Sequence, residues 1–306
     1  MKIVFMGTPD FAIPSLDACN EHHQVIGVIS QPDRPRGRGK AVVPSPLKQR
    51  AMELGLQTFT FEKISRDGVD LLKQLNPDIM VTAAYGQILS DEILSLCKYG
   101  VINVHGSILP DFRGSSPVQH AILRGDKESG VTIMQTARAV DSGDIIRIEK
   151  TEIGESEGTI SLLDRLSHIG ANALIKALSD IENNIATFTP QDHDKATFCK
   201  MLTKLDAVID WTMSAEEISR RVRAFDYMGA STTINGELLK IYTCSVTKGN
   251  GDAGKVIDIN EKLGVTVACG KDSIIIGQML MAGGKRISSC DAVRGRKISL
   301  GDKLGN

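Results

Sequence analysis

Cysteine pairs, long apolar runs and internal repeats are all missing from this sequence of 306 residues. The six cysteines form no C-x-x-C pair, so their spacing predicts neither a zinc site nor a disulfide framework, and we expect buried free thiols. No apolar run approaches the length of a bilayer span, and the apolar start over residues 2–6 is too short for a signal peptide. These absences favour a cytoplasmic protein with no metal and no membrane partner.

Net charge is small as well, −1 at pH 7, which by itself argues against a nucleic-acid binder. The two parts of the chain differ, however. Residues 1–194 carry 19 Lys and Arg against 25 Asp and Glu, whereas residues 195–306 carry 17 against 12. A basic excess of this size fits a nucleic-acid partner and also an ordinary solvated surface, so it needs a second observation.

Ordinary globular composition, with 42% hydrophobic and 24% charged residues, predicts an ordered chain with a buried core. At this length two domains are expected, although one large α/β domain stays open. The first half alternates apolar β-branched runs with helical patterns, which predicts a doubly wound, mostly parallel, Rossmann-like sheet with its function at the carboxyl ends of the strands. The predicted strands are 2–6, 25–30, 56–60, 78–83 and 101–104, and the predicted helices are 15–21, 45–54, 66–75 and 91–96.

The pattern changes after an amphipathic helix predicted over 159–181. We therefore expect a catalytic domain over 1–189, a linker over 190–205 and a smaller C-terminal domain over 206–306. A Ser-capped helix is predicted there over 214–225. The predicted strands that follow, broken by Gly, Asn and Asp, favour a small β-barrel, OB-like, or a sandwich, and they cover 238–242, 254–259, 264–269 and 273–277.

The segment VINVHGSILPDFRG, at 101–114, ends a predicted strand with polar side chains at the edge where a parallel sheet places its active site. Asn103 and His105 are two residues apart, so on an extended strand both side chains point to one face. An amide that holds an oxyanion and an imidazole that moves a proton suit acyl-type transfer. The alternative is that both residues only cap a turn.

A second polar stretch, AVDSGDI at 139–145, interrupts two strand-like runs at 131–135 and 145–150. Asp and Gly in such a position are typical of a turn. A short loop that returns to the same sheet edge would also bring Asp141 beside His105, where the carboxylate would orient the ring. Both interpretations remain open at this point.

Several separated motifs resemble one family when they are taken together. GTPDF at 7–11, NVHGSILP at 103–110, FRG at 112–114 and DSGD at 141–144 look like the folate-dependent formyltransferases. The resemblance to the branch that acts on methionyl-tRNA extends over nearly the whole chain, through QPDRPRGRGK at 31–40, VPSPLK at 43–48, IDW at 209–211 and RAF at 223–225.

The resemblance implies transfer of a formyl group from 10-formyltetrahydrofolate to an amine, without a metal. It implies Asn103, His105 and Asp141 as catalytic residues. Asn103 and protonated His105 would stabilise the oxyanion, and Asp141 would hold His105 and accept the proton of the amine. The residues implied around the folate pocket are Ser107, Ile108, Leu109, Pro110, Tyr85 and Gly86.

Residues 34–40, RPRGRGK, carry four positive charges, and their proline and glycines exclude a helix, so we expect an exposed basic loop. Such a loop suits a mobile arm for phosphate, and a merely solvated loop is the alternative. Together with the resemblance, it points to methionyl initiator tRNA as the acceptor, bound by a monomer. The residues expected to contact tRNA are Arg34, Arg36, Arg38, Lys40, Lys285 and Arg286.

One departure from the family and three alternatives remain. After RAF the family commonly has an Asn-Pro-Trp-Pro-Gly-like turn, whereas this chain reads DYMG at 226–229, which puts in doubt the shape of the domain junction and any stacking there but does not affect the chemistry. The alternatives are formyl transfer to an amino-sugar nucleotide, formyl transfer to glycinamide ribonucleotide, and a non-enzymatic tRNA or folate binder. The basic loop argues against the two small acceptors, and the intact trio Asn103, His105 and Asp141 argues against the binder.

Overall fold

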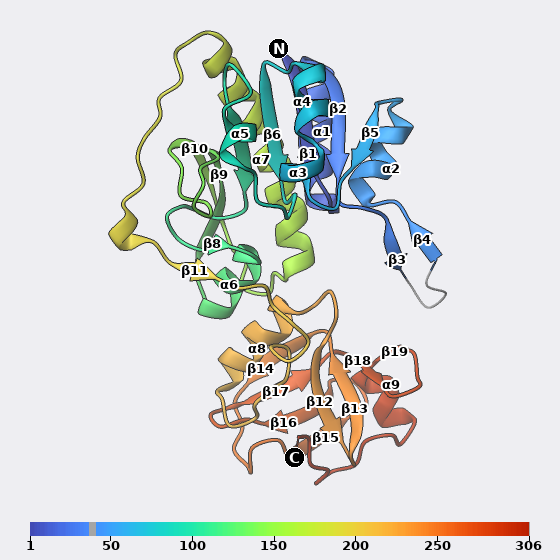
Figure 1. Cartoon of the computed structure of the whole chain (residues 1–306). Coiled ribbons are helices and arrows are strands. Elements are labelled where there is room, and N and C mark those ends of the chain that lie inside the picture. Colours follow the sequence, from blue (N-terminus) through green and yellow to red (C-terminus); the bar gives the residue numbers. More distant parts are fainter. Residues whose placement is uncertain (37–40, 306) are drawn as a thin grey trace. The chain divides into compact units, whose positions relative to one another are not determined.

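Two compact units make up the computed structural model, which describes residues 1–36 and 41–305 (Figure 1). None of the helices in this described part is long and apolar enough to cross a membrane. Unit 1 comprises Met1–Pro117, Glu128–Glu152 and Leu163–Cys199, and unit 2 comprises Val118–Lys127, Ile153–Leu162 and Lys200–Asn306.

A seven-stranded sheet forms the centre of unit 1, in the order β10-β9-β7-β6-β1-β2-β5 (Figure 1). The five strands from β7 to β5 are parallel, and β9 runs antiparallel to both of its neighbours. The strands are β1 (Lys2–Gly7), β2 (Gln24–Ser30), β5 (Thr58–Thr60), β6 (Ile79–Ala83), β7 (Val101–His105), β9 (Glu128–Gln135) and β10 (Ile145–Glu152). This architecture confirms the predicted fold class.

The order of strands reverses beside β1. The chain runs outward from β1 through β2 to β5, and then returns to place β6 and β7 on the other side of β1. Such a reversal opens a crevice at the carboxyl ends of the strands, which is where open α/β sheets bind their ligands. The polar residues at the end of β7 therefore lie beside the expected binding crevice.

Helices flank this sheet (Figure 1), and its central strands β1 and β6 are accordingly mostly apolar, and buried except for Lys2 at the start of β1. Ser45 caps α2 by accepting a hydrogen bond from the Lys48 amide at 3.2 Å, which agrees with the start of the helix predicted over 45–54. The single helix predicted over 66–75 is wrong, because the chain forms two short helices that meet at Gly68, where a Cβ would lie 2.8 Å from the Ile64 side chain. The helices of unit 1 are α1 (Ile13–His22), α2 (Pro46–Glu53), α3 (Ile64–Asp67), α4 (Val69–Leu75), α5 (Asp91–Leu94) and α7 (Thr159–Glu182), of which the residues through Leu162 belong to unit 2. All but the first residue of α6 (Pro117–Arg124) belongs to unit 2.

The basic segment is partly a strand. β3 (Arg34–Arg36) pairs antiparallel with β4 (Ala41–Val43). The prediction of a loop is therefore wrong for residues 34–36. A strand is possible there despite Pro35, because each strand of a two-stranded ribbon has one unpaired edge, where the missing N–H is not needed. Arg38 and Lys40 lie outside the described residues.

Unit 2 contains two four-stranded antiparallel sheets, in the orders β12-β13-β18-β19 and β14-β17-β16-β15. The predicted strands correspond to β13, β15, β16 and β17, and the sequence missed the other four strands and α9. The closed, OB-like barrel stays a prediction. The elements are α8 (Ala215–Ala224), β12 (Ala230–Ile234), β13 (Glu237–Ile241), β14 (Cys244–Thr247), β15 (Val256–Asn260), β16 (Gly264–Ala268), β17 (Ser273–Ile276), β18 (Gln278–Met281), β19 (Arg286–Ser288) and α9 (Ser289–Arg294).

Both sheets of unit 2 contribute to one apolar core. Trp211 is buried in it, and its indole N–H donates to the Thr232 hydroxyl at 2.9 Å, which satisfies the one polar group of the ring. The IDW motif at 209–211 therefore contributes to the core of unit 2. The helix predicted over 214–225 begins with a capping box, in which the side chains of Ser214 and Glu217 each accept from the other's backbone amide.

The altered turn at 226–229 has a defined structure within unit 2. The Asp226 carboxylate accepts from the Ile160 amide in the first turn of α7, where a negative charge is favourable. Gly158 makes this approach possible, because a Cβ there would lie 2.1 Å from the carboxylate. Burial raises the pKa of Asp226 above its ordinary value.

Candidate active site

The carboxyl end of β7 carries two of the predicted catalytic residues, Asn103 and His105. Pairing with β6 places Thr82 beside Asn103, and pairing with β9 places Thr132 beside His105. His105 is buried and Asn103 is half-buried. Because residues two apart on a strand share a face, both side chains lie on the same side of the sheet.

The third residue, Asp141, comes from the loop between β9 and β10. Its Oδ2 lies 3.6 Å from His105 Nδ1, and its Oδ1 lies 3.5 Å from Asn103 Nδ2. The hypothesis that this loop returns to His105 is therefore confirmed. Neither contact is a tight hydrogen bond, so both nitrogens keep donor capacity for a substrate atom. The carboxylate is close enough to contact the same atom.

Three hydrogen bonds from other segments hold the Asp141 loop. The Gly114 amide donates to Asp141 Oδ2 at 2.8 Å. The Gln191 side-chain amide donates to the main-chain oxygens of Asp141, at 3.0 Å, and of Gly143, at 2.7 Å. Asp141 has a φ of +47°, a backbone conformation that non-glycine residues adopt uncommonly. The position of its carboxylate therefore depends on contacts outside its own loop.

A hydroxyl on the neighbouring strand sets the orientation of the Asn103 amide. Thr82 Oγ1 lies 2.8 Å from Asn103 Oδ1 and donates to it. With the amide oxygen occupied in this way, the NH₂ group faces the Asp141 carboxylate. The opposite orientation would point an amide oxygen at that carboxylate, which is electrostatically unfavourable.

His105 is held by the segment that follows β7. Its Nε2 lies 3.0 Å from the Phe112 main-chain oxygen, which only accepts, so Nε2 carries the proton of this hydrogen bond. The Cys199 thiol donates to the same oxygen at 3.4 Å. Burial, with a smaller effect of the Asp141 charge, raises the pKa of Cys199 to about 11, so this thiol stays protonated and unreactive.

The residues expected along the folate pocket differ in exposure. Ile108 and Pro110 are half-buried, whereas Ser107 and Leu109 are buried. The Ser107 hydroxyl donates to the Asp111 main-chain oxygen at 2.6 Å, and the Leu109 amide donates to the Thr132 hydroxyl at 3.1 Å. Ser107 and Leu109 therefore stabilise the loop, and the two half-buried side chains supply its surface.

Tyr85 is buried, and its main-chain oxygen is hydrogen-bonded within the fold. Its side chain is buried in an apolar cluster with residues of β1 and β6, and burial raises the pKa of its phenol. Its main-chain oxygen accepts from the Thr8 hydroxyl at 3.2 Å and from the Gln31 side-chain amide at 3.1 Å. The following Gly86 is exposed and has a φ of +82°.

The predicted tRNA-contacting residues that the structure describes are exposed. In unit 1, Arg34 forms an exposed ion pair with Glu62 at 2.8 Å, a contact of the kind that contributes about 0–1 kcal/mol and that a phosphate can replace. Of Arg36 only the backbone is described. In unit 2, Lys285 is exposed, and the guanidinium of exposed Arg286 lies 4.2 Å from the centre of the Tyr242 ring.

Sequence reasoning missed the residues that support the three catalytic candidates. Thr82 had a usable signal, since it is a polar residue near the end of a predicted strand. Gln191 had none, because it follows Asp141 by 50 residues and was expected to be part of a linker. Among the described residues, no three His, Cys, Asp or Glu side chains gather as a metal site would require.

The chain matches the formyl transferase family in two places. The family model "Formyl transferase" covers residues 1–178, and "Formyl transferase, C-terminal domain" covers residues 201–297. A methionyl-tRNA formyltransferase from Sulfurihydrogenibium sp. is 41% identical over 310 residues, which cover 99% of this chain and 100% of that protein.

Two solved structures have a similar fold at lower identity. A methionyl-tRNA formyltransferase from Clostridium thermocellum aligns with a TM-score of 0.57 and 19% identity, over 82% of this chain and 95% of that one. An N-formyltransferase from Helicobacter canadensis, in complex with folinic acid and dTDP-3-aminofucose, aligns with a TM-score of 0.68 and 20% identity, over 90% and 99%. The two family models and the full-length identity establish that the chain belongs to the formyl transferase family, alongside the methionyl-tRNA formyltransferases.

Proposed function

We propose that this protein transfers the formyl group of 10-formyltetrahydrofolate to the amino group of methionyl initiator tRNA. The observation that carries the chemistry is the convergence of Asp141 with His105 and Asn103, at 3.6 and 3.5 Å. The choice of acceptor is supported by relatives named methionyl-tRNA formyltransferase, which match the whole chain. We infer further that the enzyme acts in the cytoplasm as a monomer, since one chain supplies all the proposed residues.

In the first step, the neutral amine attacks the formyl carbon, so that a C–N bond forms and the carbonyl oxygen becomes an oxyanion. Asn103 Nδ2 and a protonated His105 Nδ1 both lie beside the Asp141 carboxylate and are not saturated by it. They would donate to the oxyanion. Each pre-organised donor of this kind contributes about 10²–10³ in rate.

In the second step, the tetrahedral carbon releases the folate. Asp141 takes the proton of the attacking nitrogen, directly or through water, and returns a proton to N10 as the C–N10 bond breaks. Tetrahydrofolate and N-formylmethionyl-tRNA result, with no net proton change. His105 already has Nε2–H bound to Phe112, so its ring is oriented with Nδ1 toward the reacting atoms.

The folate is proposed to bind against the loop after β7 and the loop after β6. The half-buried Ile108 and Pro110 offer apolar surface to a flat ring, and the exposed Gly86 lets a ligand approach the backbone closely. The Helicobacter canadensis relative, whose structure includes folinic acid, supports a folate site in this fold. Ser107, Leu109 and Tyr85 would act by shaping these loops.

The tRNA is proposed to contact two basic regions. Arg34, Arg36, Arg38 and Lys40 would bind phosphates near the acceptor end, and Lys285 and Arg286 would bind the backbone elsewhere on the tRNA. Backbone contacts of this kind provide affinity and position but do not by themselves select a sequence.

Acceptor choice tests the proposal. The purified protein would be incubated with 10-formyltetrahydrofolate and, in separate reactions, methionyl initiator tRNA, methionyl elongator tRNA, an amino-sugar nucleotide and glycinamide ribonucleotide. We expect formylation of the initiator tRNA at the highest kcat/KM. Faster formylation of either small acceptor, or none of any acceptor, would contradict the proposal.

A further inference from the structure

Asp141 occupies a backbone conformation that its own loop does not secure. Its φ is +47°, and the side chain of Ser142, next to it, bonds only within the loop, to the Ala139 main-chain oxygen. The contact from the Gly114 amide holds the carboxylate itself. The main chain of the loop is held from outside by the Gln191 amide, which donates to Asp141 O and Gly143 O.

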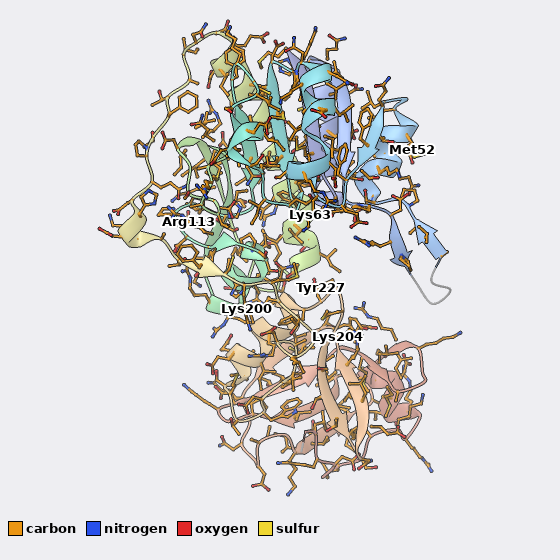
Figure 2. All side chains as sticks on the ribbon, viewed as in Figure 1. Met52, Lys63, Arg113, Lys200, Lys204 and Tyr227 are labelled. Carbon is orange, nitrogen blue, oxygen red and sulfur yellow. The ribbon has the colours of Figure 1, made fainter. Side chains whose placement is uncertain are left out.

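Gln191 is in turn fixed by a buried arginine. Arg113 Nε and Nη2 both donate to Gln191 Oε1, at 3.1 and 2.7 Å, and Nη2 also lies 2.9 Å from His193 Nδ1. Only 4% of Arg113 and 6% of Gln191 is exposed, so these bonds are shielded from water. Arg113, labelled in Figure 2, is the first residue of the short strand β8 (Arg113–Gly114). Its two-pronged contact fixes which end of the Gln191 amide is oxygen.

We infer that Gln191 is a positioning residue for Asp141, and that Arg113 orients Gln191 for this purpose. The amide is the required group because one end must accept from a guanidinium while the other donates to two main-chain oxygens. The role rests on the proposed function of Asp141 as the proton acceptor. It predicts that Gln191 acts on the rate of formyl transfer and little on substrate binding or fold stability.

The variant Gln191→Glu separates positioning from stability. Its carboxylate keeps the contact with Arg113 and gives that buried cation an opposite charge, which offsets part of the stability lost with the two amide hydrogen bonds. Its second oxygen, however, faces the main-chain oxygens of Asp141 and Gly143 at the distances now spanned by hydrogen bonds. The two acceptors repel, and the loop must move. Gln74→Glu, on an exposed side chain of α4, makes the same chemical change and is the matched control.

The experiment measures single-turnover formylation, substrate affinity and melting temperature for both variants. We expect Q191E to lose at least 10-fold in rate, with its KM within threefold of the parent and its melting temperature lowered by no more than about 5 °C, and Q74E to match the parent. A Q191E rate within threefold of Q74E would overturn the inference. If Q191E does not fold, Gln191→Met, uncharged and of similar size, is measured in its place with the same expected loss.

Combination with Asp141→Asn shows whether Gln191 acts through Asp141. In the Asp141→Asn background, Q191E should cost less than threefold, because the group that it misplaces no longer takes the proton. An equal loss in both backgrounds would refute the positioning role even if each single variant is slow. A fully active Asp141→Asn would instead contradict the proposed function, so the two failures are distinguishable.

Discussion

A methyl group on Gly143 should displace the Asp141 loop without changing any charge. The loop is closed by a hydrogen bond from the Gln135 amide to the Asp144 oxygen, at 2.8 Å, and Gly143 lies against Gln135 inside this closure. A Cβ at Gly143 would lie 1.9 Å from Gln135 O and 2.9 Å from the carbon of the same carbonyl. Gly143→Ala therefore cannot fit unless main chain moves.

The required movement gives the size of the effect. A Cβ needs about 3.2 Å from a main-chain oxygen, so the main chain at Gly143 and at Gln135 must separate by roughly 1.3 Å. Overpacking of this kind costs about 1–3 kcal/mol of stability. Asp141 is two residues away and would move with the loop. Since a misplacement of about 1 Å costs on the order of 100-fold in rate, we expect kcat/KM for formylation to fall about 30- to 300-fold.

The assay is steady-state formylation of methionyl-tRNA, with a folate-binding titration and a thermal melt on the same preparation. Ser142→Ala is the control, because it changes the adjacent residue and removes one loop hydrogen bond but adds no atom. We expect it to stay within threefold of the parent. If Gly143→Ala also stays within threefold while it remains folded, the geometry of this loop does not govern the reaction.

Two further predictions concern charge. Replacing Arg36 and Arg38 with Ala removes up to two phosphate contacts, so the slope of log Kd for tRNA against log salt should fall by about one to two units, and an unchanged slope would exclude these residues from binding. In unit 2, hydrogen bonds from Lys200 and then Thr203 hold the pKa of Asp206 well below its ordinary value. Because the folded pKa is the lower one, this stabilisation is present above about pH 4 and is lost as pH falls through the folded pKa. Asp206→Asn should therefore lower the unfolding free energy at pH 7 but not at strongly acid pH, and an equal loss in urea titrations at both pH values would contradict the assignment.

The parallel core of unit 1 could be predicted from the sequence because its signals are local. Strands such as β1 are continuous apolar runs, and Ser45 and Ser214 mark their helices by capping. The break at Gly68 was missed because a glycine inside a helical pattern is compatible with both a continuous helix and two short ones. The strands β12, β14, β18 and β19 were missed because their runs are short and partly polar.

The catalytic candidates could be predicted from the sequence, but the residues that hold them in position could not. Asn103 and His105 are related by strand periodicity, which the sequence displays directly. Gln191 and Arg113 meet only because the chain returns to the sheet edge after α7, and no local pattern records that return. The segment over 190–205 had the composition of a linker, yet residues 190–199 belong to unit 1 and supply the Gln191 contact with the Asp141 loop.

The most direct test of the account is the rate of formyl transfer by Asp141→Asn, measured in a single turnover with saturating 10-formyltetrahydrofolate and methionyl initiator tRNA. Asn retains an oxygen that can accept from the Gly114 amide, so the loop should keep its place while the proton acceptor is lost. We predict a loss of at least about 100-fold, with the Kd values for folate and tRNA within threefold of the parent. A rate within about tenfold, or about 1.4 kcal/mol of barrier, would show that Asp141 does not take the proton.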